Sequence, residues 1–109
     1  MIVANLPNNE AERLISLDRH KILDTLAESS YDEIVKLAAH ICGAKIAMIS
    51  FVDGNRVWPK ATIGAHAIEI PRDISFCSHA ILQDQPLVIA DLRQDFRFRE
   101  NPLVTAEPS

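Results

Sequence analysis

The feature that most constrains the fold is a short segment, residues 45–52 (KIAMISFV), that is apolar on both of its alternating faces. Its apolar side chains divide between the two faces, with Ile46, Met48 and Val52 on one and Ala47, Ile49 and Phe51 on the other. Successive side chains of a strand point to opposite faces of the sheet, and a strand that is apolar on both faces needs cover on both. The segment therefore predicts a strand inside a sheet that has protein packed on each side.

A turn and a second strand follow this segment directly. Residues 53–55 (DGN) are a strong turn signal, and residues 56–63 alternate between apolar and polar side chains, as a returning strand does. Pro59 interrupts this second strand, and proline has no N–H to donate to a neighbouring strand. We therefore expect an antiparallel hairpin whose second strand is an edge strand or has a bulge at Pro59.

The segment before the hairpin predicts a helix over residues 30–42. Ser30 and Glu33 have the spacing of a capping box, and Gly43 supplies the left-handed residue that commonly ends a helix. The apolar side chains recur at intervals of three and four residues and predict one wide buried stripe, formed by Tyr31, Ile34, Val35, Ala38, Ile41 and Cys42. This helix is expected to pack on the sheet, with Cys42 in the core.

Other elements are expected on either side of this helix and hairpin. An earlier helix begins at Glu10, after an arm formed by residues 1–9. A third helix is expected over residues 76–82, capped by Asp73 or Ser75, and residues 87–90 (LVIA) predict a third strand.

The composition of the 109 residues fits one soluble domain and argues against several classes of protein. Hydrophobic residues make up 48% of the chain, enough for a core, and the net charge of −4 argues against a nucleic-acid partner. No apolar stretch approaches the roughly 20 residues that cross a bilayer, so we expect no membrane insertion. Two cysteines are too few for a disulfide framework and favour a reducing, cytoplasmic location.

The strand over residues 45–52 lacks an obvious second neighbour. The hairpin supplies one partner, and the segment over residues 87–90 is the other candidate. An unpaired apolar strand edge promotes aggregation, and native proteins cover such edges. We favour a neighbour that lies beyond residue 109, which would leave the sheet incomplete.

Residues 70–91 (IPRDISFCSHAILQDQPLVIAD) resemble the GAF domains found at the N-terminus of bacterial sensor histidine kinases and diguanylate cyclases. The block at residues 73–81 (DISFCSHAI) is specific for this subgroup. Further similarity runs along nearly the whole chain, from residues 9–14 (NEAERL) to residues 101–104 (NPLV). Two positions depart from the family: Pro59 stands where an aromatic residue is usual, and Ala106 where glycine is common.

The resemblance implies an α+β fold, in which helices flank an antiparallel sheet and one face of the sheet forms a pocket under the middle helices and loops. Family members continue with further strands and a long C-terminal signalling helix. The expected domain, residues 10–109, is therefore an incomplete GAF domain that lacks the late strands and this helix.

The resemblance also places the candidate ligand-binding residues around the predicted third helix: Arg72, Phe76, Cys77, His79 and Asp91. Phe76 and His79 are expected in the roof of the pocket, although a half-buried structural histidine is the other interpretation of His79. Arg72 is either an ion-pair partner of Asp73 or a clamp for a ligand carboxylate. Asp91 and Asp95 are also expected to brace their own loop.

The cysteines and histidines form no recognisable catalytic or metal-binding pattern. Cys77 and His79 are two residues apart, which on a helix turns them about 200° from each other, and the other histidines are scattered. We therefore expect no catalytic residue and no metal site, with Cys77 a small buried side chain. Some GAF relatives attach a bilin through a cysteine directly before a histidine; here Ser78 intervenes, so no cofactor is implied.

These observations predict a non-catalytic sensory GAF module. We expect it to bind an unidentified small molecule, to form a homodimer and to control an output kinase or cyclase domain in a larger protein. Two alternatives remain open, namely a structural or dimerisation domain without a ligand, and a thiol-dependent enzyme that uses Cys77. Trp58, on the polar face of the second strand, is either a dimer or partner contact or is covered by the first helix.

Overall fold

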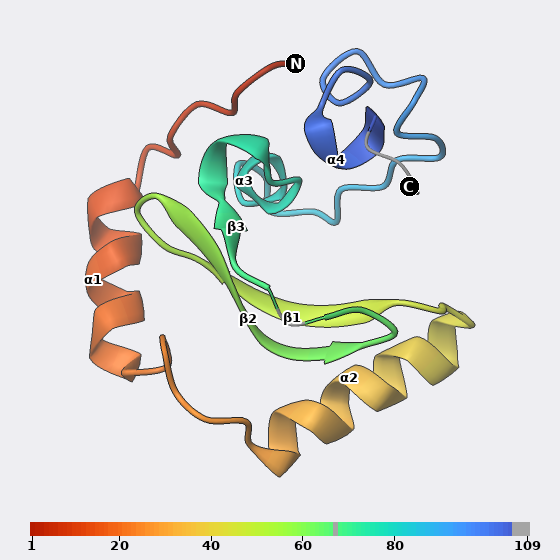
Figure 1. The fold of residues 1–109 in the computed structure, drawn as a ribbon. Helices are drawn as coiled ribbons and strands as arrows, with labels where there is room; N and C mark the ends of the chain where they lie inside the picture. Colours follow the sequence, from red (N-terminus) through yellow and green to blue (C-terminus); the bar gives the residue numbers. More distant parts are fainter. Residues whose placement is uncertain (67, 106–109) are drawn as a thin grey trace.

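The computed structural model describes residues 1–66 and 68–105 and has helices on both sides of a small sheet (Figure 1). Its elements in chain order are α1 (Glu10–His20), α2 (Ser29–Cys42), β1 (Ala47–Val52), β2 (Arg56–Ile63), β3 (Ile70–Pro71), the 3-10 turn η1 (Arg72–Ile74), α3 (Cys77–Ala80) and α4 (Pro102–Thr105). This arrangement confirms the predicted α+β fold class. Residues 67 and 106–109, which include Ala106 and the end of the expected domain, lie outside the described residues.

The three strands form an antiparallel sheet in the order β1-β2-β3. In the predicted hairpin, Ile49 pairs with Ala61 and Ser50 pairs with Pro59, so Lys60 has no partner on β1. This extra residue is a bulge directly after the proline, which confirms one of the two expectations for Pro59. The other expectation, that β2 is an edge strand, is wrong at the start of β2, because β3 pairs there with Arg56 and Val57.

The edge of β1 that faces away from β2 is open in the part of the chain that the structure describes. The predicted strand over residues 87–90 does not form, because this segment has no regular secondary structure and 85% of the Val88 side chain is exposed. Apolar residues alone do not make a strand, since a strand is defined by hydrogen bonds to a neighbour. Among the described residues, β1 is therefore an edge strand that pairs with β2 alone. That a further strand beyond residue 109 covers this edge stays a prediction.

The helices cover both faces of this sheet (Figure 1). α2 packs along one face, whereas η1, α3 and the C-terminal segment lie over the other, and α1 lies beside the β1–β2 turn. Both faces of β1 thus have protein against them, but the predicted cover is only partial: Val52 is the one buried residue of the strand, and 49% of Met48 is exposed. None of the helices in the described ranges is long and apolar enough to cross a membrane.

α2 packs on the sheet with a narrower stripe than its sequence predicts. Val35 and Ala39 are buried, whereas 56% of Ile34 and 72% of Ile41 are exposed, and Cys42 is exposed as well. The expectation that Cys42 belongs to the core is therefore wrong. The physical reason is the width of the sheet: three strands, of which β3 has two residues, cannot cover the whole apolar side of a helix.

The ends of the helices follow the sequence only in part. α2 ends at Gly43 in the predicted left-handed conformation, with φ of 61°. It begins at Ser29, however, without a side-chain cap, so the capping box of Ser30 and Glu33 does not form. α3 is shorter than expected; the Oγ atom of Ser75 accepts a hydrogen bond from the backbone N–H of Ser78 at 3.1 Å, so Ser75 braces its first turn and Asp73 does not.

Candidate functional site

A cavity of about 260 Å³ lies between the sheet and the segment that runs from β3 into α3. β1 contributes Met48 and Ser50, and β2 contributes Val57 and Pro59, because residues two apart on a strand share a face. The remaining wall comes from the loop before β3, from β3 to α3 and from α4, through His66, Ile68, Ile70, Ser75, Phe76, Cys77 and Leu103.

Two of the five predicted site residues lie on the wall of this cavity. Phe76 and Cys77, at the start of α3, line it together with residues of the sheet. The ring of Phe76 also packs edge-on against Phe98, with ring centroids 5.2 Å apart. Phe98 is completely buried and fixes α3 to the C-terminal segment.

His79 does not line the cavity and instead holds the N-terminal arm in place. Its Nε2 atom lies 3.1 Å from the carbonyl oxygen of Ile2, and its ring packs against Phe98 at a centroid distance of 4.7 Å. The side chain is buried. The contacts of His79 are those of a structural histidine with a backbone partner, which was the second interpretation of this residue, and not those of a pocket residue.

Arg72 is also buried away from the cavity. Its guanidinium group donates to both carboxylate oxygens of Glu10 and, at 3.1 Å, to the carbonyl oxygen of Asp53. Arg72 therefore joins η1 to α1 and to the β1–β2 turn. Its partner is Glu10 on a distant helix rather than the neighbouring Asp73, a contact that no local sequence pattern indicates.

Asp91 lies in a separate, shallow hollow on the surface, next to Val104. It accepts hydrogen bonds from the backbone N–H and the guanidinium of Arg93, which keeps the pKa of Asp91 below its usual value. Asp95 makes the same pattern of contacts with Arg97. The expected bracing of this loop by the two aspartates is confirmed.

The electrostatic character of the cavity follows from its walls. Its lining residues include one basic side chain, the imidazole of His66, and no Asp, Glu, Lys or Arg. The Ser75 hydroxyl already donates to the carbonyl oxygen of Arg72 at 2.8 Å. The hydroxyl of Ser50 differs, because it is the one buried side-chain oxygen or nitrogen without a hydrogen-bond partner among residues 1–66 and 68–105. Burial raises the pKa of the Cys77 thiol, so the thiolate is disfavoured at this wall.

Ser50 is the residue that the sequence prediction missed. A signal was present, because Ser50 is the polar residue inside the apolar segment 47–52. Breaks in an otherwise consistent pattern tend to mark functional positions. Met48, Pro59 and Ile70 were missed as well, since their approach depends on how the hairpin, β3 and α3 pack.

A second, wider groove of about 560 Å³ lies between α1, the start of α2 and the end of β1. The α1 side of this groove is open to solvent, because four of its lining residues are exposed: Asn9, Glu12, Ser16 and His20. Within the described ranges, no three His, Cys, Asp or Glu residues gather where they could hold a metal ion. The cavity beside α3 is the better site for a small organic molecule, because apolar walls and few polar groups are typical of such sites.

Comparison with known proteins decides the family. A model of the GAF domain matches residues 26–109 of this chain. The chain belongs to the GAF domain family. GAF domains are generally regulatory, non-catalytic modules, and this one has the antiparallel sheet and the flanking helices that the resemblance implies.

This GAF domain also has a curated relative. Over 102 residues it is 37% identical to a cyclic di-GMP phosphodiesterase from Pseudomonas aeruginosa, an alignment that covers 94% of this chain and 17% of the relative. The chain therefore spans about a sixth of the length of that relative, and the similarity concerns its GAF portion.

Proposed function

We propose that this GAF domain is a non-catalytic sensor that binds a small molecule in the cavity between its sheet and α3 and thereby controls an output domain. The cavity is the observation that carries the proposal. It is bounded by three strands on one side and by Phe76 and Cys77 on the other, so an occupant would contact both layers of the fold at once.

A sensor also needs a physical route from the cavity to the rest of the molecule, because a ligand acts only by favouring one of two arrangements. Arg72 supplies such a route: it lies between Ile70 and Ser75, which line the cavity, and it binds Glu10 in the first turn of α1. The contact between His79 and Ile2 supplies a second one, from α3 to the N-terminal arm. Arg72 thus acts as a connection to α1 rather than as a ligand clamp.

We further propose that the output domain makes or degrades cyclic di-GMP. The named activity of the Pseudomonas aeruginosa relative supports cyclic di-GMP turnover, and the sequence resemblance points to diguanylate cyclases and histidine kinases. Deleting the gene in its native host should change the cellular level of cyclic di-GMP. An unchanged level together with altered phosphorylation of a response regulator would favour the kinase instead.

We also propose that the domain is located in the cytoplasm. The two free cysteines support this location, because disulfides are rare in reducing compartments.

Ligand binding is tested by thermal denaturation of the purified chain against cyclic nucleotides, amino acids and other metabolites. A ligand of the native state raises the melting temperature by mass action. The Cys77→Leu substitution enlarges a side chain on the wall of the cavity and should reduce that rise. Cys42→Leu is the matched control, since Cys42 is exposed on α2. If no compound shifts the melting temperature of the unmodified chain, the sensor proposal fails.

A second candidate function, a dimerisation domain, is favoured by the outer side of α2. Ile34, Leu37 and Ile41 are each more than half exposed and lie three and four residues apart, so they form one apolar stripe. A second copy of the chain is the occupant that we propose for this stripe, in agreement with the homodimer expected from the sequence. Trp58 is half-buried beside the Lys60 ammonium and is not part of the stripe.

A further inference from the structure

α1 and the linker that follows it, residues 10–28, are attached to the rest of the domain with little apolar burial. We call these residues the α1 segment. None of the α1 residues is buried, and Ile22 is the one buried residue of the linker. A groove of about 560 Å³ separates α1 from the sheet, and both Leu17 of α1 and Phe51 of β1 line it. Apolar packing therefore contributes little to holding this segment in place.

Ion pairs supply much of the attachment instead. Three ion pairs join the α1 segment to the rest of the described chain, and each has its carboxylate on the segment and its cation on β2 or η1: Glu10–Arg72, Asp24–Arg56 at 2.8 Å and Glu28–Lys60 at 2.6 Å. Charged groups also donate to backbone carbonyl oxygens across the contact, from Arg13 to Val52 and from Lys60 to Leu26. The contact is thus made mainly by charged groups.

The linker is held in a conformation that its own backbone does not favour. Lys21 and Asp24 have φ of 51° and 59°, the left-handed region that is unfavourable for residues with a Cβ atom. Arg56 binds both carboxylate oxygens of Asp24, each at 2.8 Å. The ion pair therefore fixes the linker at one of its two strained positions, and release of this pair would let the backbone relax.

Both ends of the α1 segment are fixed by contacts that do not involve it. Before it, Ile2 is bound by the His79 side chain and by the backbone carbonyl of Arg97. After it, α2 packs on the sheet through Val35 and Ala39. The segment can therefore leave and return while the rest of the domain stays folded. Once undocked, α1 would unwind, because an isolated helix of 11 residues is marginal in water.

We infer that the α1 segment is an ionically docked element that undocks as a unit while the sheet and α2 remain folded. Arg72 makes this equilibrium responsive to the cavity beside α3, because it lies between Ile70 and Ser75, which both line that cavity. An occupant that displaces this stretch weakens the contact with Glu10 and favours the undocked state. This regulatory use rests on the proposed sensor function, whereas the ionic docking itself does not require a ligand.

Hydrogen exchange of the 109-residue chain in 0.05 M and 1 M sodium chloride tests the inference. Salt at 1 M screens charges beyond about 3 Å, whereas burial of apolar side chains is not screened. Rates measured by mass spectrometry are divided by those of the urea-unfolded chain at the same salt concentration. We expect exchange of residues 10–28 to rise about fivefold in 1 M salt, while β1 and β2 keep their protection.

The Asp24→Asn variant tests the ion pairs directly. It removes one carboxylate of the contact, and asparagine tolerates the left-handed conformation as aspartate does. Arg56 keeps Asp53 and Glu69 as partners, so the variant leaves β2 intact. Exchange of residues 10–28 in 0.05 M salt should rise about threefold, and the further rise in 1 M salt should be smaller than in the unmodified chain.

Asp18→Asn is the matched control. Asp18 lies on α1, but its ion pair, with Lys21, is internal to the α1 segment. The control should therefore exchange like the unmodified chain at both salt concentrations.

Three results would overturn the inference: exchange of residues 10–28 that does not depend on salt, an equal rise in β1 and β2, or equal effects of the two aspartate substitutions. Each would leave the sensor function intact, because none of these measurements uses a ligand. Failure of the metabolite screen, in contrast, would remove the sensor function and leave the measured undocking unaffected.

Discussion

Arg72 donates a hydrogen bond to Glu10 across a distance of 3.1 Å, from Nη2 to Oε2, and this contact joins two segments that are far apart in the sequence. Arg13 binds the same carboxylate at 2.8 Å, and its other guanidinium nitrogen reaches the carbonyl oxygen of Val52. Glu10 therefore holds two cations between α1 and the end of the hairpin. Hydrogen bonds from Arg72 first, and then from Arg13, lower the pKa of Glu10 to about 2.

The Glu10→Gln substitution should lower the free energy of unfolding by about 1–3 kcal/mol at pH 7, because the two arginines lose their carboxylate. Glu10 has a lowered pKa in the folded state, so its contribution is complete above its ordinary value of 4.5 and is lost as the pH falls towards about 2. The difference between the unmodified chain and the variant should therefore shrink across this window. Urea denaturation followed by circular dichroism at several pH values measures it.

Glu12→Gln is the control for this prediction. Glu12 lies on the same helix, is exposed, and has no ion pair within the described ranges. Its substitution should change the free energy of unfolding by less than about 0.5 kcal/mol. Equal effects of the two substitutions, or a Glu10→Gln effect that does not depend on pH below 4.5, would contradict the role assigned to Glu10.

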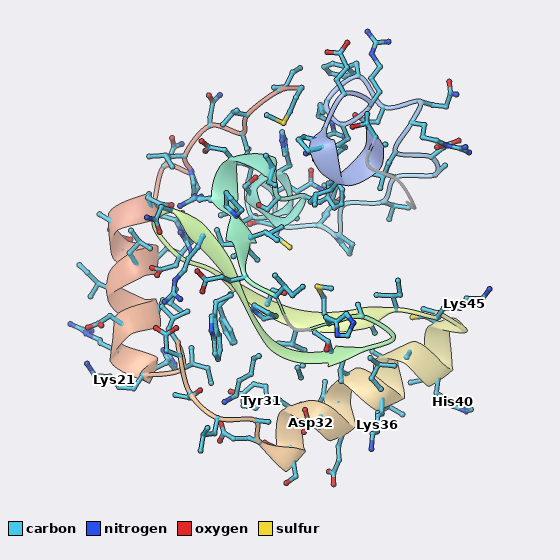
Figure 2. The ribbon with its side chains drawn as sticks, viewed as in Figure 1. Lys21, Tyr31, Asp32, Lys36, His40 and Lys45 are labelled. Carbon is cyan, nitrogen blue, oxygen red and sulfur yellow. The ribbon has the colours of Figure 1, made fainter. Side chains whose placement is uncertain are left out.

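Lys60 holds the linker between α1 and α2 against the sheet. Its side chain is fully buried, and its Nζ atom lies 2.6 Å from both Glu28 Oε2 and Thr25 Oγ1. The ammonium also lies over the rings of Tyr31, at 5.5 Å, and of Trp58, at 5.9 Å; Tyr31 is labelled in Figure 2. The bulge in β2 places Lys60 without a partner on β1.

The Lys60→Met substitution should release this linker and lower the free energy of unfolding by about 1–2 kcal/mol. The loss stays moderate because removing the buried ammonium also removes its cost of desolvation. Hydrogen exchange should rise at residues 24–28. Lys36→Met is the control, because Lys36 is exposed on α2 (Figure 2) and should leave both quantities unchanged. Unchanged exchange in the Lys60 variant would show that the linker does not depend on this contact.

The sequence was most informative where local pattern decides the structure. The hairpin and the left-handed Gly43 follow from a few neighbouring residues, and Pro59 limited its strand to an edge or a bulge, of which the structure has the bulge. Burial along α2 could not be predicted in this way, because Cys42 is exposed or buried according to the width of a sheet formed by other residues.

The candidate site shows the same division. Phe76 and Cys77, which the family resemblance placed at the pocket, line the cavity, but Arg72 and His79 instead contact Glu10 and Ile2, which are distant in the sequence. Such long-range partners leave no local pattern. Ser50 was visible as an irregularity in an apolar strand, but its place at the cavity depends on how the hairpin packs against α3.

Cys77 should react more slowly with N-ethylmaleimide at pH 7.5 than Cys42. Burial raises the pKa of the Cys77 thiol and reduces its thiolate fraction, whereas Cys42 is exposed. Mass spectrometry of the two tryptic peptides gives both rates in one sample, and urea-unfolded chain gives the reference in which the two rates converge. A faster reaction at Cys77 in the folded chain would revive the alternative of a thiol-dependent enzyme.

The apolar stripe of α2 should drive self-association, and Ile41→Lys should weaken it. Ile41 is 72% exposed, so the substitution costs the folded monomer little, and a cation suits the C-terminal turn of a helix. Loss of one buried isoleucine contact, worth about 1.5–3 kcal/mol, should raise the dimer dissociation constant by about tenfold or more, measured by analytical ultracentrifugation.

His40→Lys is the matched control for Ile41→Lys, because it adds the same cation to an exposed neighbour without removing an apolar side chain (Figure 2). A chain that stays monomeric at every concentration, or that dimerises equally well in both variants, would remove the stripe as a contact between copies and with it the dimerisation function.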